Sequence, residues 1–317
     1  MTGIPGGRPG PRRKKVIGQE DVIPFLRGAL GPDREVCIGG LFKQNRPVAL
    51  VRELIRSGMG GLRLFSSPGS GYDVDLLIAA GMVAECFLPA VTLEDRLCPN
   101  FRRAVEQGLV RAHAVDALAI VGGLMAGAHG LPFHPVAAWR GSDVVALNPL
   151  AVEMRSPFGG EPLHAVKALR PDLVLLHAQE ADEYGNVRHL TTMTYADNLM
   201  ARAGRKVLVS VDRLVKPDVV TGSPRETTVP CIYVDAVVEI PFGAHPTASF
   251  PHYGMDEAFI GDFADLSDAV RRDPSAQPRL DEYIDTYLRR PRDIFEYIDA
   301  VGGYRRLAAL EREARFV

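Results

Sequence analysis

Short apolar runs alternate with amphipathic segments along most of the chain. Residues 35–40 (EVCIGG) form an apolar run that ends in a glycine pair, as a buried strand does before a tight turn. Residues 45–58 follow with apolar positions at helical spacing, with Asn45 as the expected N-cap and Gly58 as the closing residue. Further strands are predicted at residues 62–66, 84–90, 172–178, 206–214 and 232–241, and further helices at residues 18–30, 73–81, 99–108 and 117–130.

The order of these elements predicts the fold class. Strands that alternate with helices of about ten residues favour a parallel sheet. Apolar runs without strict alternation are typical of strands that are buried on both faces. We therefore predict an α/β fold, with an open, mostly parallel sheet, helices on both of its faces, and a helical C-terminal tail from residue 278. The chain shows no internal repeat and no long linker, so we expect residues 19–317 to form one domain.

The N-terminal segment has a different composition. The first 15 residues contain four Gly, three Pro and five Lys or Arg. Such a segment buries too little apolar area to offset the entropy lost on ordering, so we predict a disordered basic tail over residues 1–18. The segment lacks the apolar core of a signal peptide, and no apolar stretch approaches the roughly 20 residues of a membrane helix. We expect a cytoplasmic protein without a membrane role.

Composition narrows the possible functions. The chain is 46% apolar and 24% charged, with a net charge of -2, which does not favour binding to nucleic acid. The four cysteines are widely spaced, with no CxxC or Cys/His cluster, so we expect reduced, buried thiols rather than a zinc site or a disulfide framework. The chain has neither an HExxH nor a GxSxG motif, so the motifs of a zinc protease and of a serine hydrolase are missing.

Two loops rich in small residues follow predicted strands. Gly39 and Gly40 end the first strand, and residues 66–71 (SSPGSG) follow the next one. Glycine lets the backbone approach a ligand closely with its amides pointing outward, and ligands of open parallel sheets bind beyond the carboxyl ends of the strands. The two loops together indicate a ligand crevice, although a tight strand-to-helix turn is an equally simple interpretation of each. Neither loop matches a dinucleotide or P-loop motif.

An acidic turn follows the strand at residues 172–178. Glu180, Asp182 and Glu183 are followed by Gly185 and Asn186. Adjacent residues on an extended chain point to opposite faces, so Asp182 and Glu183 are poorly placed to share a metal ion. Gly and Asn tolerate positive φ, and Asp182 can accept backbone hydrogen bonds across the bend. We interpret the segment as a structural turn, with a ligand contact or a metal site as the alternatives.

Several stretches, read together, resemble one family. Residues 157–187 (PFGGEPLHAVKALRPDLVLLHAQEADEYGNV) strongly resemble a segment of the α (A) subunit of class I coenzyme A transferases of the glutaconate and 3-oxoacid type. Residues 39–54 are similar to the N-terminal glycine motif and first helix of that subunit. Further similar stretches, in the same order, are residues 71–83, 99–108, 130–135, 140–144, 239–256 and 283–303. The resemblance covers about residues 20–312.

The resemblance implies a fold, a reaction and a partner. The family fold is an open, largely parallel sheet with flanking helices, and the α chain works with a β chain in heterodimers or dimers of heterodimers. In such transferases a glutamate of the β chain attacks an acyl-CoA thioester, and CoA then passes through a glutamyl-CoA thioester to an acceptor carboxylate. The family therefore implies that CoA arrives as a substrate, that no cofactor or metal is needed, and that the nucleophile lies on the partner.

The resemblance also implies which residues of this chain contact the substrate. The glycine loops are the expected oxyanion donors and pocket lining, because backbone amides aimed at a developing oxyanion stabilise it. Asn45 and Arg46 are expected near the acyl carboxylate, with a solvated arginine at a helix end as the alternative for Arg46. The loop residues expected to bind substrate are Gly39, Gly40, Ser67, Gly69, Ser70 and Gly71.

Two positions depart from the family pattern. Relatives that are ring-opening acyl-CoA hydrolases have a working glutamate where this chain has Ala117, directly after Asp116. This departure disfavours such a hydrolase unless Asp116 takes over with its shorter side chain. Many relatives also have an arginine where this chain has Ala137. Arg140, next to Trp139 at an expected pocket rim, is the candidate replacement; the alternative is a substrate that lacks the carboxylate which such an arginine would bind. The alternatives are a hydrolase or decarboxylase on the same heteromer, and a non-catalytic acyl-CoA or sugar-phosphate binding protein.

Overall fold

A nine-stranded sheet forms the centre of the protein. The computed structural model describes residues 13–139, 141–191 and 194–314. The parallel strands run in the order β4–β3–β2–β1–β8–β10–β12, so the predicted parallel sheet is confirmed. Their bounds are β4 Arg111–Ala112, β3 Val83–Phe87, β2 Leu62–Phe65, β1 Glu35–Ile38, β8 Leu173–Asp182, β10 Lys206–Val215 and β12 Ala236–Glu239. The order of the strands reverses between β1 and β8, which is where ligands of open α/β sheets bind.

Helices cover both faces of this sheet, as predicted. Successive residues of β1 point to opposite faces: Val36 and Ile38 belong to one apolar core and Cys37 to another. The first core is covered by α1 (Val22–Ala29), α2 (Val48–Arg56), α3 (Tyr72–Ala79) and α4 (Pro99–Glu106) together with the C-terminal helices. The second core is covered by α5 (Ala117–Ala128) and α7 (Asp197–Ala203). Gly127 lets α5 approach closely, because a Cβ at that position would meet the carbonyl oxygen of Leu169.

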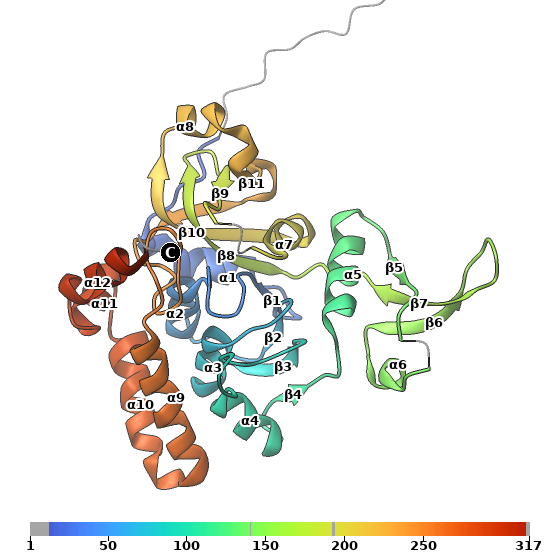
Figure 1. Ribbon diagram of the computed structural model, residues 1–317, viewed down its shortest axis with the longest axis horizontal. Coiled ribbons are helices and arrows are strands. Elements are labelled where there is room, and N and C mark those ends of the chain that lie inside the picture. Colours follow the sequence, from blue (N-terminus) through green and yellow to red (C-terminus); the bar gives the residue numbers. More distant parts are fainter. Residues whose placement is uncertain (1–12, 140, 192–193, 315–317) are drawn as a thin grey trace, which may run out of the picture.

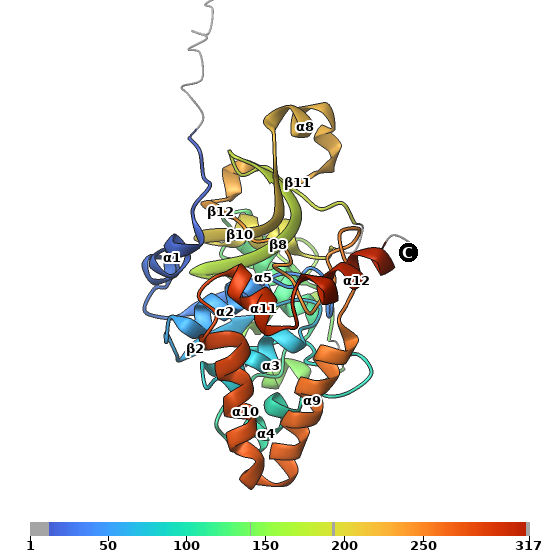
Figure 2. The same ribbon diagram turned by 90° about the vertical axis from the view of Figure 1, so that its left-hand side faces the viewer.

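The C-terminal part of the chain is helical, as predicted. Figures 1 and 2 show α9 and α10 side by side at one end of the molecule. The pair leads through a π-helical turn, Asp285–Arg289, to two further helices that pack on the first core. The helices are α9 Glu257–Arg272, α10 Gln277–Ile284, α11 Ile294–Ala300 and α12 Tyr304–Ala314.

Residues 133–167 form a small lobe that the sequence did not predict. The lobe contains a three-stranded antiparallel sheet in the order β5–β7–β6, and Figure 1 shows it at the right, apart from the parallel sheet. Its elements are β5 Phe133–Val136, α6 Val144–Leu147, β6 Ala151–Arg155 and β7 Pro162–Lys167. Its strands are short and contain both polar and apolar residues on each stretch, so the two-residue hydrophobic alternation that predicts a strand is weak. The lobe is attached to the main body through α5.

Several boundaries differ from the sequence-based expectations, two of them near the N-terminus and in the last strand. The predicted basic tail reached residue 18, but the amide of Ile17 donates to Val237 and the amide of Val237 donates to Lys15, so residues 15–17 pair with β12. Residues 1–12 lie outside the described part of the chain. The strand predicted at 232–241 begins only at Ala236, because Cys231–Tyr233 form a 3-10 turn.

Short elements complete the fold. β9 (Val187–Arg188) pairs antiparallel with the last residues of β8, and β11 (Thr227–Val229) pairs antiparallel with β9. The helix α8, Pro217–Gly222, follows β10 and lies at the top of Figure 1. Within the described ranges, no helix is both long and apolar enough to cross a membrane.

Candidate functional site

The two glycine loops lie side by side at the carboxyl edge of the parallel sheet. They follow β1 and β2, which are neighbours in the sheet. Arg46 joins them, because its Nη1 donates to the carbonyl oxygens of Gly40 (3.1 Å) and Gly69 (3.4 Å). Its Nη2 lies 3.4 Å from the hydroxyl of Ser70 and forms an ion pair with Asp73. The prediction that both loops share one edge is confirmed.

Both sequence-based interpretations of Arg46 are wrong. Its side chain is fully buried, so it is not a solvated arginine at a helix end. Its guanidinium is engaged with Asp73 and with loop carbonyls, so it is not available to an acyl carboxylate. Arg46 instead fixes the spacing between the two loops.

The amides of Gly39 and Gly40 are used within the fold. The Gly39 amide donates to the carbonyl oxygen of Leu175 on β8 (2.9 Å). The Gly40 amide donates to Oδ1 of Asp197, the first residue of α7 (3.0 Å). Gly40 has φ +89°, and a Cβ there would lie 2.6 Å from the carbonyl oxygen of Asn45. The predicted oxyanion role of these two amides is therefore wrong, and the glycines are required for close packing.

The second loop is also held by its surroundings. The Ser70 amide donates to the carbonyl oxygen of Ala90 (2.9 Å), and the Gly71 amide lies 3.4 Å from Oδ1 of Asp73. The predicted oxyanion role is wrong for these two amides as well. Ser67 is fully buried, and its hydroxyl has no hydrogen-bond partner among the described residues. The backbone amides of Ser67 and Gly69 stay candidate donors.

Asn45 is not the N-cap of α2, because Pro47 occupies that position. Asn45 has φ +51°, and its Oδ1 accepts a hydrogen bond from Nε2 of Gln179 (2.7 Å). The same Nε2 also donates to the hydroxyl of Ser249 (2.9 Å), which in turn donates to Asp212 (2.6 Å). Because Asn45 follows β1 and Gln179 lies on β8, this chain of hydrogen bonds crosses the point where the strand order reverses.

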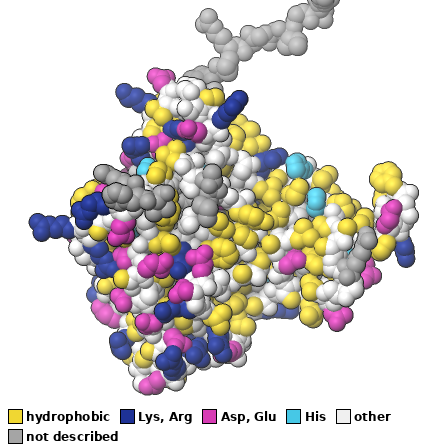
Figure 3. All heavy atoms as spheres, viewed as in Figure 1, with side chains coloured by type: hydrophobic (Ala, Val, Ile, Leu, Met, Phe, Trp, Pro, Cys, Tyr) yellow, Lys and Arg dark blue, Asp and Glu magenta, His cyan; other side chains and the backbone are white. Residues whose placement is uncertain are grey.

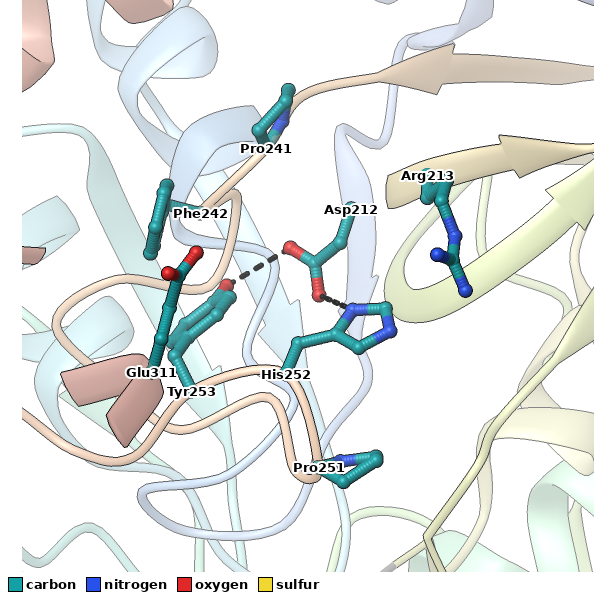
Figure 4. A pocket seen from close by; sticks show the side chains of 8 residues that line it. All are labelled: Asp212, Arg213, Pro241, Phe242, Pro251, His252, Tyr253 and Glu311. Atoms are coloured by element: carbon teal, nitrogen blue, oxygen red, sulfur yellow. Dashed lines mark hydrogen bonds and ion pairs between the residues drawn. The ribbon is translucent and has the colours of Figure 1, made fainter. Parts of the chain in front are cut away.

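Asp212 is the centre of a buried polar network at one side of this edge. Its carboxylate lies 3.1 Å from both Nδ1 of His252 and the hydroxyl of Tyr253, as Figure 4 shows. Nε2 of His177 lies 3.4 Å from the same carboxylate. Burial acts to raise the pKa of Asp212, but the contacts with His177, His252 and Ser249 outweigh it and lower the pKa to about 2. Asp212 is therefore a carboxylate at neutral pH.

A pocket of about 390 Å³ opens beside Asp212. Residues from β10, from the loop after β12 and from α12 line it, as drawn in Figure 4: Asp212, Arg213, Pro241, Phe242, Pro251, His252, Tyr253 and Glu311. The sequence reasoning missed this site. The only sequence feature that indicates this site is the stretch at 239–256, which contains His252 and Tyr253 and belongs to the family resemblance.

Asp116 has a structural role in this chain. It is the N-cap of α5 and accepts from the amide of Ala119 (2.8 Å). Its other oxygen accepts from Nε1 of Trp139 (2.6 Å), which ties α5 to the lobe. Trp139 lines a cavity of about 870 Å³ in the lobe, next to His164. Asp116 is thus engaged by the fold and poorly placed to replace a catalytic glutamate, and Arg140 lies outside the described residues.

The acidic turn at the end of β8 is structural, as predicted, and Glu180 and Asp182 still belong to the strand. Oδ1 of Asp182 accepts from the amides of Tyr184 (3.0 Å) and Asn186 (2.9 Å), and its Oδ2 accepts from Nδ2 of Asn186 (2.7 Å). Glu180 is paired with Arg188 (2.6 Å) and with Arg213. Within the described ranges, no group of three or more His, Cys, Asp or Glu could hold a metal ion.

Asp182→Ala is expected to lower the free energy of unfolding by about 1–2 kcal/mol, because three donors lose their acceptor. Urea unfolding followed by circular dichroism measures this loss. Glu183→Ala is the matched control, since Glu183 pairs with the exposed Lys14 at the surface and its removal should change the free energy of unfolding much less. A loss of activity in Asp182→Ala that added divalent metal restores would contradict the structural role.

The thiols are unreactive at neutral pH where they are buried. Cys37, Cys86 and Cys98 are free and buried. Burial raises the pKa of each thiol, that of Cys86 to about 12. These cysteines therefore stay protonated and are not nucleophiles.

Comparison with known proteins identifies the family. Residues 26–240 match the family model described as coenzyme A transferase. The chain is 32% identical to the A subunit of a 3-oxoadipate CoA-transferase from Pseudomonas knackmussii, over 79% of this chain and 86% of the relative. It is also 32% identical to a cholesterol ring-cleaving hydrolase IpdA subunit of Rhodococcus jostii, over 90% of this chain and 95% of the relative.

Solved structures agree on the fold. Glutaconate coenzyme A-transferase of Acidaminococcus fermentans superposes with a TM-score of 0.84 at 24% identity, over 93% of this chain and 95% of that chain. The decarboxylase AibA/AibB superposes with a TM-score of 0.71 at 29% identity, over 85% of this chain and 100% of that chain. This chain spans 64% of the length of an uncharacterized Archaeoglobus fulgidus protein that is 31% identical over 94% of this chain. The chain belongs to the coenzyme A transferase family, and its relatives there include the A subunits of CoA-transferases.

Proposed function

We propose that the chain is the α subunit of a heteromeric CoA-transferase, which moves CoA between an acyl-CoA and a carboxylic acid. The observation that carries this proposal is the match to A subunits of CoA-transferases along most of the chain, 79% of it for the 3-oxoadipate enzyme and 85% for the glutaconate enzyme. The joined loops at the carboxyl edge of β1 and β2 support it, because they form a rigid rim at the place where ligands of such sheets bind.

The partner in this proposal is a CoA-transferase β subunit, in a heterodimer or a dimer of heterodimers. The glutaconate and 3-oxoadipate relatives are themselves named as subunits. In an acyl-CoA transferase of Escherichia coli, the same fold makes up half of a single chain. CoA enters as a thioester substrate, and no cofactor is part of the proposal. A cytoplasmic location, where thiols stay reduced, belongs to the same proposal.

The proposed reaction divides acyl transfer into steps on the partner's glutamate. The glutamate carboxylate attacks the thioester carbonyl, the C–S bond breaks, and CoA leaves as a thiolate. The thiolate attacks the glutamyl carbonyl of the resulting anhydride, which releases the first acid as a carboxylate and forms a glutamyl-CoA thioester. The acceptor carboxylate then attacks this thioester, and the reverse steps deliver CoA to the acceptor.

This chain contributes the rim of the cleft to that reaction. The amides of Ser67 and Gly69 are its candidate donors to the tetrahedral oxyanion, which such donors stabilise by about 3–4 kcal/mol each. Asn45 is held by Gln179, and Arg46 holds the two loops at a fixed spacing. A rim that is already fixed needs no reorganisation when charge develops.

Hydrolysis on the same fold is the second candidate. The 32% identity with the hydrolase subunit of Rhodococcus jostii favours it. The contacts of Asp116 disfavour it, because one carboxylate oxygen caps α5 and the other accepts from Trp139. Ala117, the position where that type of hydrolase has its glutamate, carries no proton-transfer group. We therefore favour transfer to an acid over transfer to water.

The test is mass spectrometry of the complex purified through a tag on this chain. Incubation with an acyl-CoA and no acceptor is expected to leave a CoA adduct on a glutamate of the co-purified chain and none on this chain. Addition of an acceptor acid should discharge the adduct and form the new acyl-CoA. Release of free CoA without an acceptor, at the same rate as with one, would favour the hydrolase. Thioester turnover by this chain alone would contradict the proposal.

A further inference from the structure

The lobe has one sheet face made almost entirely of apolar side chains. Residues that pair directly across antiparallel strands point to the same face, and the register pairs Pro135 and Val152 with Ala165, and Met154 with Leu163. Phe133 lies on the same face opposite Lys167, which is its only charged member. We call this surface the apolar lobe face; its apolar residues are Phe133, Pro135, Val152, Met154, Leu163 and Ala165.

The opposite face of the same sheet is the one that is packed. His134 and Val166 lie against Gly122 of α5, within 3.5 and 3.7 Å of where a Cβ would stand. Farther along the sheet, Glu153 and His164 of this face line the cavity in the lobe, together with Met154 and Leu163 of the apolar lobe face. The packed face carries the buried apolar residues Val136, Ala151 and Val166 in addition to its histidines, so both faces of the sheet are rich in apolar side chains. An antiparallel sheet with one face in water usually carries polar side chains on that face, and the open face of this sheet does not.

The apolar lobe face is open in this chain. Val152 is 65% exposed and Phe133 is 37% exposed. At the tip of the β6–β7 hairpin, Phe158 is 98% exposed. Figure 3 shows hydrophobic side chains gathered over α5 and the lobe, whereas charged side chains dominate the left and lower parts of the same view. Monomeric proteins rarely expose such contiguous apolar surfaces, and those that do usually bind a partner there.

The chemistry of the face limits what can cover it. With Lys167 as its only charge, it offers no row of cations for nucleic acid phosphates. It fits the apolar core of a lasting protein interface, in which charged residues are depleted and large aromatic anchors are enriched. Phe158 and Phe133 are the anchors of that kind.

We propose that the apolar lobe face, with Phe158, is the docking surface for the β-type partner subunit. The proposal rests on the proposed function, which requires a second chain that carries the nucleophile. A partner chain is favoured over a second copy of this chain because the CoA-transferase relatives are named as A subunits, which implies a second kind of subunit. In the Escherichia coli enzyme the matching part likewise makes up only half of a single chain. Docking at the apolar lobe face places the lobe against the partner. It also brings α5 close to the partner, because the Trp139–Asp116 hydrogen bond ties α5 to the lobe.

The affinity test uses the glutamate-bearing chain identified by co-purification. Val152→Glu combined with Met154→Glu introduces two carboxylates into the apolar lobe face and is expected to raise the Kd for that chain at least about 30-fold. Phe158→Ser should raise it at least about tenfold. Because all three side chains are at least partly exposed, unfolding transitions of the variants should match that of the wild type.

The matched controls are apolar residues that are equally open but lie outside the lobe. Phe295 on α11 is 73% exposed and Ile232 is 74% exposed. Phe295→Ser and Ile232→Glu are expected to leave the Kd unchanged within about twofold. Unchanged affinity in the lobe variants, or an equal loss in the controls, would overturn the proposed docking surface. Since the wild-type complex is assayed for CoA transfer in parallel, this failure is distinct from failure of the proposed function.

Photocrosslinking identifies the occupant directly. The photoreactive residue p-benzoylphenylalanine is placed at position 158 and, as the control, at position 295. Irradiation of the purified complex should join position 158 to the β-type chain and give no such product from position 295. A product that contains two copies of this chain would show that the face serves self-association, and that outcome, like no product at all, would overturn the proposal.

Discussion

Replacing Arg46 with methionine is expected to lower the free energy of unfolding by about 3–5 kcal/mol. Arg46 and Asp73 are both fully buried, so the variant leaves the Asp73 carboxylate without its cation in a place that water does not reach. The carbonyl oxygens of Gly40 and Gly69 lose a shared donor at the same time. Urea unfolding of the full chain measures the loss of unfolding free energy. The CoA-transfer activity of the complex should also fall, because the two loops lose the arginine that joins them.

Two further variants make this prediction specific. Arg289→Met removes an exposed pair with Asp285 and should cost no more than about 0.5 kcal/mol. Combining Arg46→Met with Asp73→Leu removes both charges and should recover part of the loss, since the unpaired charge is the main penalty. A loss in Arg46→Met as small as that of Arg289→Met would mean that other contacts hold the loops together.

The sequence was most informative where local pattern decides the structure. The apolar runs around Val36, Leu64, Leu175 and Val209 form parallel strands in the structure. A strand that is buried on both faces is apolar at successive positions and shows no alternation of polar and apolar residues, which is the pattern that these runs have. The lobe was missed for the opposite reason. Its strands are four to six residues long and carry His134, Glu153 and His164, whose surroundings are set by α5 and by the lobe cavity rather than by a sequence period.

The sequence located the candidate site but not the roles of its residues. Neighbouring parallel strands bring the loops at Gly40 and Gly69 to one edge, which the order of elements predicts. Whether a loop amide is open to a ligand depends on distant residues: Gly40 donates to Asp197, which lies 157 positions further on. The role of Arg46 is hidden in the sequence because its partner Asp73 lies 27 positions further on, in the first turn of α3.

The network around Asp212 could not have been predicted from spacing. Ser249, His252 and Tyr253 reach Asp212 from 37 to 41 positions further along the chain, and His177 reaches it from the neighbouring strand β8. No local sequence motif indicates that these residues are in contact. Most buried polar groups have a hydrogen-bond partner, and here the partners come from segments that only the fold brings together.

Acidification is expected to remove about 2–3 kcal/mol of folding stability through Asp212 alone. The folded chain lowers the pKa of Asp212 from 3.8 to about 2, because contacts with His177, His252 and Ser249 outweigh the opposing effect of burial. A depressed carboxyl pKa contributes stability that is fully present above the unfolded value and is lost as pH falls toward the folded value. The loss should therefore occur between about pH 4 and pH 2.

Comparing wild type with Asp212→Asn isolates this contribution. At neutral pH the variant should be the less stable protein, and the difference in unfolding free energy should narrow as the pH falls from about 4 to 2. Asp75 provides a control of opposite sign, because burial raises its pKa from 3.8 to about 6. Its contribution is largest at low pH and is lost as pH rises through about 6, so the wild-type advantage over Asp75→Asn should shrink in that direction. A gap between wild type and Asp212→Asn that stays constant with pH would show that Asp212 titrates normally, and the buried network would then have no electrostatic role in holding the loops after β10 and β12.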